Sequence, residues 1–307
     1  MLSLQATLVR LSLRGVKTLW NMRTPIEDQR RNLEKLAARI AYFVKLPPDV
    51  TVAPVKIENV RGEWIHPTGI ETPYVFVYLH GGGFSMGSLN SHRLGVVEIT
   101  RTSGIRGLAL DYRLAPENPF PAAVEDTIAV YSWLLNNGFK PEHIVFIGDS
   151  AGAGLVLSAM LLLREFEDPL PAGAVLISPW VDLMGTAQSI KTRAKSDPWL
   201  TPDALLFGSY YAAELNKAEP LISPLYADLR GLPPLLIQTG NDDVLLNDST
   251  RLAEKAWADE LQVTLEIWGG MWHDFPLFAS VVPEAQQAQR HMSKFMWHQC
   301  LKAHPPH

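Results

Sequence analysis

The sequence contains one cysteine, Cys300, among its 307 residues. A single cysteine cannot build an internal disulfide framework, and it leaves no cysteine cluster that could bind a metal. We therefore expect a reducing, cytoplasmic setting and no metal site.

Charge is also sparse, because only 19% of the residues are charged and the formal net charge is −5. The charges are not gathered into blocks of one sign, so the chain lacks the basic surface that nucleic-acid binding requires. Hydrophobic residues make up 47% of the chain, enough to bury one large core and well outside the disordered class. The composition predicts a folded domain with no nucleic-acid partner.

A long uninterrupted hydrophobic run is missing as well. Residues 1–22 are apolar and free of acidic groups, but Arg10, Arg14 and Lys17 interrupt them before a signal peptide or a membrane span can develop. We expect no stable membrane insertion. The spacing instead predicts an amphipathic helix on an apolar surface, either of the protein or, as the alternative, of a membrane. Its apolar face would comprise Leu4, Leu8, Leu11, Val16, Leu19 and Trp20.

Helical and strand patterns alternate along the rest of the chain. A second helix over residues 26–44 ends before Pro47 and Pro48. Apolar β-rich runs then predict strands over 74–79, 105–111, 144–147, 174–177, 235–238 and 263–268. Helices are predicted over 91–103, 121–136, 151–165, 249–260 and 283–301, and antiparallel edge strands over 52–66. This order indicates an α/β sheet with helices on both faces.

Residues 180–215 break the alternation, because they contain no strand pattern yet remain rich in large apolar side chains. We interpret this segment as an insertion that packs over the sheet. No internal repeat or low-complexity run is present, which excludes a solenoid.

The strongest motif is Gly148-Asp149-Ser150-Ala151-Gly152, placed between a predicted strand and a predicted helix. It resembles the nucleophile elbow of α/β-hydrolases, in which a strained turn exposes the serine and flanking glycines let strand and helix approach. The helix amino terminus behind Ser150 also favours developing negative charge.

A second motif, His80-Gly81-Gly82-Gly83-Phe84, follows the strand predicted at 74–79. It resembles an oxyanion loop, in which the backbone N–H groups of Gly82 and Gly83 act together with that of Ala151. His80 would then shape the loop by hydrogen bonding and would not act as a base.

Serine needs a base, and the α/β-hydrolase order is serine, acid, histidine. His273 lies in a loop after the strand at 263–268, where catalytic side chains occur. Among the later histidines, His291 and His298 lie in the last predicted helix, where solvent or packing roles fit better, and His304 and His307 lie in a Pro-rich tail.

Three aspartates after the strand at 235–238 are candidates for the acid: Asp242, Asp243 and Asp248. Asp248 has another explanation as the N-cap of a helix starting at Ser249. Spacing does not decide between Asp242 and Asp243. Asp111 and Asp149 precede the serine, so we expect them to brace loops by accepting backbone hydrogen bonds.

Together these residues resemble the bacterial hormone-sensitive lipase-like esterases, and the resemblance spans nearly the whole chain. It is carried by His80–Phe84 with Gly87-Ser88 and Ser91-His92-Arg93, by Asp111-Tyr112-Arg113-Leu114-Ala115-Pro116-Glu117, and by Gly148–Gly152. Ala153 departs from the pattern, which commonly has glycine there.

The resemblance implies an α/β-hydrolase fold with a mostly parallel eight-stranded sheet, flanked by helices and covered by a helical cap. Residues 1–46 and 182–215 would form the cap, and 47–181 and 216–307 the core. Asp243, followed by Val-Leu, matches the family's acid. Cap and sheet would border a substrate pocket that includes Phe84, Trp180, Trp199 and Leu200.

The implied activity is hydrolysis of short- to medium-chain acyl esters by Ser150, His273 and Asp243, without a cofactor. Activity should fall as His273 protonates, near pH 6 to 7. The alternatives are an amidase or peptidase with the same triad, and a non-catalytic binding protein, against which the presence of His273 argues. The family often forms homodimers, although no residue here supports one.

Overall fold

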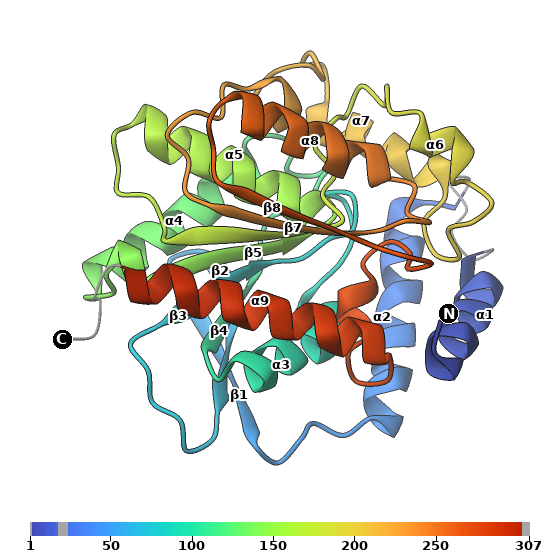
Figure 1. The fold of residues 1–307 in the computed structure, drawn as a ribbon, viewed down its shortest axis with the longest axis horizontal. Helices are drawn as coiled ribbons and strands as arrows, with labels where there is room; N and C mark the ends of the chain where they lie inside the picture. The colour runs from blue at the N-terminus through green and yellow to red at the C-terminus, as the bar shows by residue number, and fades with distance from the viewer. Residues whose placement is uncertain (1, 18–23, 303–307) are drawn as a thin grey trace.

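The computed structural model describes residues 2–17 and 24–302 of the chain, which fold around one eight-stranded sheet (Figure 1). The strands are β1 (Val50–Ile57), β2 (Val60–Pro67), β3 (Val75–Leu79), β4 (Arg106–Asp111), β5 (Ile144–Asp149), β6 (Gly173–Ile177), β7 (Leu235–Gly240) and β8 (Val263–Trp268). Their order is β1-β2-β4-β3-β5-β6-β7-β8. The strands from β3 to β8 are parallel, whereas β1 and β2 are antiparallel. The predicted fold class is confirmed.

Helices cover both faces of the sheet because side chains of the parallel strands alternate between two apolar clusters. In β3, Val75, Val77 and Leu79 contribute to the larger cluster, and Phe76 and Tyr78 to the other. The larger cluster includes residues of α4 (Ala122–Asn136), α5 (Ala151–Glu165) and α8 (Leu246–Ala258); the second includes residues of α3 (Leu89–Ser103) and α9 (Pro283–Lys302).

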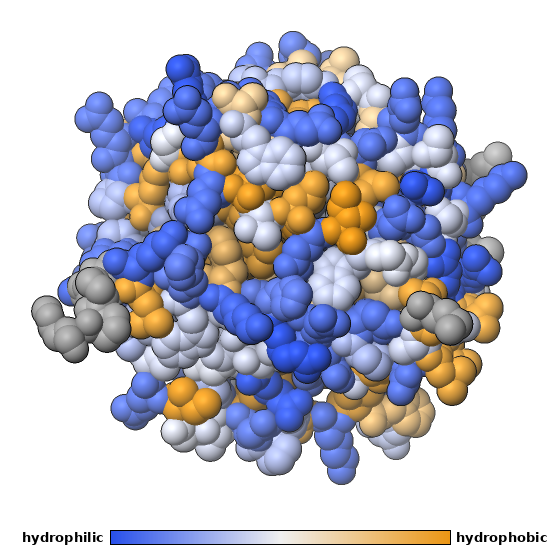
Figure 2. All heavy atoms as spheres, viewed as in Figure 1, coloured by the Kyte–Doolittle hydropathy of each residue, from blue (hydrophilic) through white to orange (hydrophobic). Residues whose placement is uncertain are grey.

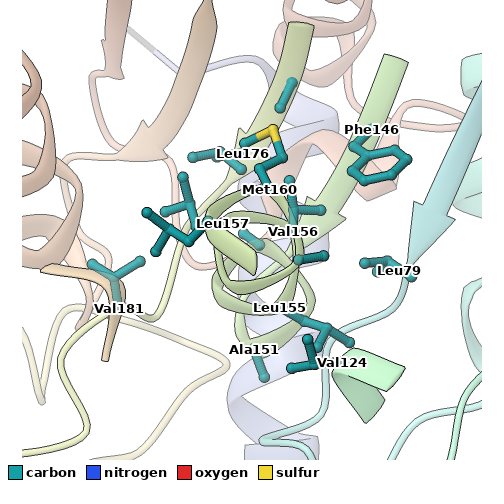
Figure 3. Packing of buried hydrophobic residues seen from close by; sticks show 14 of the residues in the cluster. Leu79, Val124, Phe146, Ala151, Leu155, Val156, Leu157, Met160, Leu176 and Val181 are labelled. Atoms are coloured by element: carbon teal, nitrogen blue, oxygen red, sulfur yellow. The ribbon is translucent and has the colours of Figure 1, made fainter. Parts of the chain in front are cut away.

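The centre of the larger cluster is α5, the helix that follows Ser150. Figure 3 shows Leu155, Val156 and Met160 of this helix packed beside Phe146 of β5 and Leu176 of β6. All but three of its fifteen residues are buried. The helix is therefore held rigidly against the sheet.

The remaining helices gather at one end of the sheet, on the right of Figure 1. They are α1 (Leu4–Lys17), α2 (Ile26–Phe43), α6 (Ser189–Thr192), the short 3-10 helix η2 (Pro202–Leu206) and α7 (Phe207–Ala212). As predicted, no strand occurs between residues 180 and 215, all of which the structure describes. Three further 3-10 turns are η1 (Pro141–His143), η3 (Pro224–Tyr226) and η4 (Phe275–Phe278).

The predicted apolar face of α1 does not pack against the protein core, which corrects the first of the two surfaces predicted for it. Leu4, Leu8 and Leu11 are 72%, 55% and 57% exposed, whereas Ala6 and Leu13 are buried against the loop that carries Met271 and Trp272. The helix has two apolar rows, and the row containing the small Ala6 approaches the core. Leu19 and Trp20 of the predicted face lie outside the described residues. No helix in the described ranges is long and apolar enough to span a membrane.

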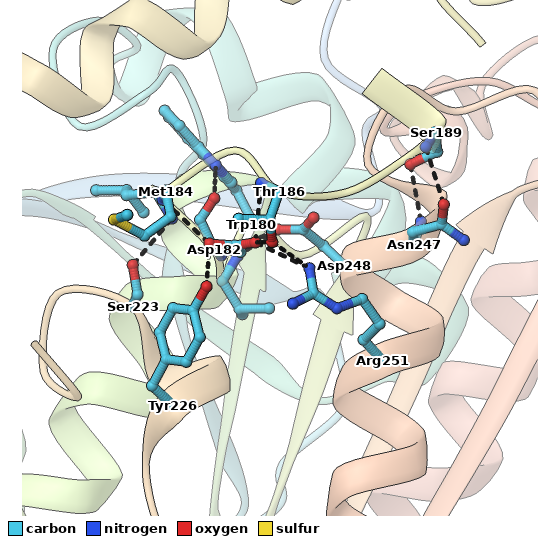
Figure 4. A network of polar contacts seen from close by, with 12 residues as sticks. Trp180, Asp182, Met184, Thr186, Ser189, Ser223, Tyr226, Asn247, Asp248 and Arg251 are labelled. Atoms are coloured by element: carbon cyan, nitrogen blue, oxygen red, sulfur yellow. Dashed lines mark hydrogen bonds and ion pairs between the residues drawn. The ribbon is translucent and has the colours of Figure 1, made fainter. Parts of the chain in front are cut away.

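The role predicted for Asp248 was also wrong. Helix α8 begins at Leu246, so Asp248 lies in its first turn and not at its N-cap. Its buried carboxylate accepts hydrogen bonds from the N–H groups of Val181 and Asp182, both at 3.0 Å. Burial raises the pKa of Asp248 to about 7. Figure 4 shows this contact beside the ion pair of Asp182 with Arg251, so the start of the insertion is anchored to α8.

Strand β8 forms one edge of the sheet, and among the described residues it pairs with β7 alone. Ile267 on this strand and Trp257 on the neighbouring α8 are 46% and 51% exposed. Figure 2 shows apolar side chains in the middle of a mostly polar surface, in the region that β8 crosses in Figure 1.

Candidate active site

Ser150 lies in a strained turn between β5 and α5, with φ of 52° and ψ of −119°. Its N–H donates to the carbonyl of Ile177 at 2.8 Å, which fixes the turn to β6. A Cβ on Gly148 would lie 2.4 Å from the carbonyl oxygen of Gly152, and one on Gly152 would lie 2.0 Å from that of Leu79. Both glycines are therefore required by close backbone approach, as the motif predicts.

His273 lies in the loop after β8 and contacts Asp243, which follows β7. Its Nδ1 is 3.1 and 3.3 Å from the two carboxylate oxygens of Asp243, and both side chains are buried. Asp243 also accepts a hydrogen bond from the N–H of Leu245 at 2.7 Å. Asp242 instead forms an ion pair with Arg10 at 2.7 Å. Of the three candidate acids, the structure brings Asp243 alone to the imidazole.

The other imidazole nitrogen has a partner that sequence reasoning missed. Nε2 of His273 lies 3.0 Å from a carboxylate oxygen of Asp274, the next residue. Within the described ranges, Ser150 and His273 share no hydrogen bond, although both line the same cavity. Burial lowers the pKa of His273, but the charges of Asp274 and Asp243 outweigh it and hold the pKa well above its usual value.

Gly82 and Gly83 form a tight loop after β3, with φ of 116° and 63°. A Cβ on Gly82 would lie 2.4 Å from the carbonyl oxygen of Met86, and one on Gly83 would lie 2.9 Å from Cβ of Phe207. Their N–H groups donate to no acceptor among the residues described. Ala151 is the first residue of α5, so its N–H has no partner within the helix. Among the described residues, the fold itself therefore provides no acceptor for these three donors.

A buried polar cluster supports this loop from behind. Asp149 accepts a hydrogen bond from the Tyr78 hydroxyl at 2.5 Å and lies 3.3 Å from Nε2 of His92. A Cβ on Gly81 would lie 2.2 Å from the Asp149 carboxylate. Asp149 thus braces the loop as predicted, but through side-chain donors and not through backbone N–H groups. The His92 contact was not foreseen, although the motif containing His92 was recognised.

The two other residues near these motifs have structural roles. The His80 ring stacks between Tyr112 and His92, at 4.4 and 5.3 Å between centroids, and burial lowers its pKa to about 4. Nδ1 of His80 also lies 2.8 Å from the carbonyl oxygen of Gly81, in agreement with the hydrogen-bonding role expected for it in the loop. Asp111 pairs with the Arg61 side chain at 2.6 Å, which corrects the backbone role predicted for it.

A cavity of about 800 Å³ opens beside Ser150 and His273. Three of the residues expected at the substrate pocket, Trp180, Trp199 and Leu200, line it. Phe84 does not, because its ring is buried and stacks on Tyr211 at 3.9 Å between centroids. Helix α2, part of the segment expected to border the pocket, supplies Leu33, Leu36 and Ile40, which the sequence analysis did not single out.

Arg10 fastens α1 to the loops of the site. Its guanidinium donates to the carbonyl of Gly270 at 2.8 Å, three residues before His273, and to that of Ser196 at 2.7 Å in the insertion. The ion pair of Arg10 with Asp242 also attaches α1 to the loop that carries Asp243. One side chain therefore joins three separate segments around the imidazole.

Two of the remaining histidine candidates, His291 and His298, do not line the cavity. Nδ1 of His291 contacts Glu266 at 2.8 Å, and His298 is exposed on α9. His304 and His307 lie outside the described residues. No three His, Cys, Asp or Glu side chains among those described are grouped to hold a metal ion.

Comparison with known proteins agrees with this geometry. The chain matches the α/β hydrolase fold family over residues 76–277. An esterase of Acinetobacter venetianus is 38% identical over 250 residues, which cover 81% of this chain and 82% of the relative. An acetyl-hydrolase of Streptomyces hygroscopicus is 38% identical over 270 residues, covering 88% and 89%. A solved esterase of the bacterial hormone-sensitive lipase family is 40% identical, with a TM-score of 0.91 over 97% of this chain and 99% of that one.

Proposed function

Because the chain belongs to the bacterial hormone-sensitive lipase-like esterases of the α/β-hydrolase superfamily, and is therefore a carboxylic ester hydrolase, we propose that it cleaves short- to medium-chain acyl esters through an acyl-enzyme on Ser150. His273 acts as the general base, and Asp243 orients it. Gly82, Gly83 and Ala151 supply the oxyanion hole.

In the first step, Nε2 of His273 takes the Ser150 proton while Oγ attacks the ester carbonyl carbon. The negative charge that develops on the carbonyl oxygen is stabilised by the three N–H groups. The imidazolium then gives its proton to the leaving alcohol. In the second step, His273 takes a proton from water, the hydroxide attacks the acyl carbon, and the proton returns to Ser150 as the acid leaves.

The observation that carries this proposal is the contact of Nδ1 of His273 with Asp243, at 3.1 Å, in a cavity that Ser150 also lines. A carboxylate at Nδ1 fixes the tautomer that leaves Nε2 free to accept a proton. Catalytic hydrogen bonds are often formed only when substrate binds, so Ser150 and His273 need to meet only then.

The cavity supports the chain-length proposal. We propose that α1, α2 and residues 182–215 form a cap over Ser150 and enclose the acyl group. A volume of about 800 Å³ accommodates a small ester but not a long triglyceride. In a series of p-nitrophenyl esters from acetyl to palmitoyl, kcat/KM should be highest below about ten carbons.

Active-site labelling tests the mechanism. A fluorophosphonate probe should label the wild-type chain and should not label Ser150→Ala, because the probe reacts only with an activated serine. Asp243→Asn should label slowly, since the imidazole loses its orienting carboxylate. Equal labelling of wild type and Ser150→Ala would refute the nucleophile. Comparing a p-nitrophenyl ester with the matching anilide measures the preference for esters over amides.

A further inference from the structure

His273 is held between two carboxylates, one on each ring nitrogen. Asp243 lies at Nδ1, where the proposed mechanism needs an acid, and Asp274 lies at Nε2, 3.0 Å away. Nε2 is the atom that must take the serine proton. Asp274 therefore occupies the position that Ser150 has to reach.

The backbone holds Asp274 in this position. Its φ of 56° and ψ of 26° are left-handed, a conformation that Asp, Asn and Gly adopt most readily. Its N–H donates to Oγ of Ser178 at 3.0 Å, at the end of β6, and its carbonyl accepts the N–H of Leu277 at 3.1 Å. The second carboxylate oxygen is buried and has no partner in the described part of the chain. Among the described residues, the Asp274 carboxylate therefore forms its ion pair with His273.

The titratable groups around this pair come from several elements. Tyr78, Asp149 and His92 face Asp274 from β3, β5 and α3, and Asp243 and Asp197 face His273 from the far side. Burial raises the pKa of Asp274, an effect that the adjacent imidazole opposes. The charges of Asp274 and Asp243 together raise the pKa of His273 despite its burial, so the two contacts favour the imidazolium.

We propose that Asp274 is a positioning residue that holds Nε2 of His273 between turnovers, so that Ser150 can transfer its proton only after Asp274 has released this nitrogen. This inference rests on the proposed function, because it assumes that His273 is the base. It adds to the triad a competition between the Asp274 carboxylate and the Ser150 hydroxyl for Nε2 of His273.

The competition at Nε2 shifts the pH dependence of activity in a defined direction. A carboxylate at Nε2 stabilises the protonated ring, so the neutral base becomes abundant only at higher pH. Removing the charge at residue 274 should lower the pKa of His273, and the acidic limb of the kcat/KM profile should move to lower pH. Removing the charge at residue 243 should instead reduce activity at every pH, because that carboxylate also orients the ring.

Two variants test this, Asp274→Asn and Asp274→Gly, both compatible with the left-handed backbone. We expect the acidic limb of kcat/KM on p-nitrophenyl butyrate, measured from pH 5 to pH 9, to move down by about one pH unit or more. Activity at pH 6 should then rise roughly tenfold, because one unit of pKa changes the neutral fraction of His273 tenfold below the limb. At pH 9 the variants and the wild type should differ little.

Asp203→Asn is the matched control, since Asp203 is exposed in the insertion and the same charge is removed there. Its profile should follow the wild type. An unmoved acidic limb in both residue 274 variants would overturn the inference. A loss of activity at all pH values, as in Asp243→Asn, would also overturn it by making Asp274 a second orienting acid.

The failure of this inference and the failure of the proposed function are distinguishable. If His273→Ala or Ser150→Ala keeps the wild-type rate and the fluorophosphonate labelling, the proposed function itself is wrong. If His273→Ala and Ser150→Ala both abolish activity while the residue 274 variants keep the wild-type pH profile, the proposed triad is supported and the competition at Nε2 is refuted.

Discussion

Arg10→Ala tests whether α1 holds the site together. The substitution removes the hydrogen bonds to Gly270 and Ser196 and the ion pair with Asp242. The Arg10 side chain is only 15% exposed, and a hydrogen bond from a charged group is worth roughly 1.5 to 3 kcal/mol. Water can solvate the freed carbonyls in part, so we expect a loss of about 2 to 3 kcal/mol.

For a chain of this size, 1 kcal/mol corresponds to roughly 2 °C in the thermal midpoint. Arg10→Ala should therefore lower the Tm by about 5 °C, measured by differential scanning fluorimetry. The loops of Asp243 and His273 lose a shared anchor, and small misplacements of a base are costly, so kcat/KM should fall by about tenfold. The loss should appear mainly in kcat.

Arg14→Ala is the matched control, because Arg14 is exposed on the same helix and makes no hydrogen bond within the described ranges. Arg10→Lys keeps the charge but cannot reach both carbonyls, so it should lie between Arg10→Ala and the wild type. If Arg10→Ala and Arg14→Ala have the same Tm and the same kcat/KM, α1 does not fasten the catalytic loops.

Three further predictions concern buried positions. Gly152→Ala should abolish activity or folding, since the new Cβ would lie 2.0 Å from a carbonyl oxygen, whereas Gly15→Ala in open space should be tolerated in a thermal melt. Asp248 has a folded-state pKa of about 7, above its unfolded value, so its charge destabilises the fold as pH rises. The Tm of Asp248→Asn relative to wild type should thus increase from pH 5 to pH 8, and a constant difference would contradict this. Asp149→Ala should lower the free energy of unfolding by about 3 to 5 kcal/mol, because it breaks a buried pair. Asp111→Ala should lower it by about 1 kcal/mol or less, because the partner of Asp111 is exposed. Urea unfolding measures both values.

The sheet and its flanking helices could be predicted because their cause is local. Apolar β-rich runs that are buried on both faces leave a clear pattern, and the turn around Ser150 leaves its glycines in the sequence. The choice of Asp243 over Asp242 came from family resemblance, and the structure brings the Asp243 carboxylate to the imidazole. Local spacing alone could not have made that choice.

What could not be predicted depends on contacts between distant segments. Asp274 faces Nε2 of His273 because Ser178, 96 residues earlier, fixes its backbone. The buried face of α1 is selected by the loop of Met271, and the helix carries a second apolar row whose spacing in the sequence is equally regular. Asp248 resembled a helix cap because the sequence does not show that the first residues of the insertion donate to it.

The close approach of Gly152 to the backbone of Leu79 and His80 has a practical consequence for protein engineering. Helix α5, which follows Ser150, and the loop after β3, which contains Gly82 and Gly83, approach each other through main-chain atoms. Neither can therefore adjust to a new substrate without disturbing the other. A randomised library intended to change selectivity should therefore leave these segments intact and vary Leu33, Leu36 and Leu200, which line the cavity and lie outside both segments.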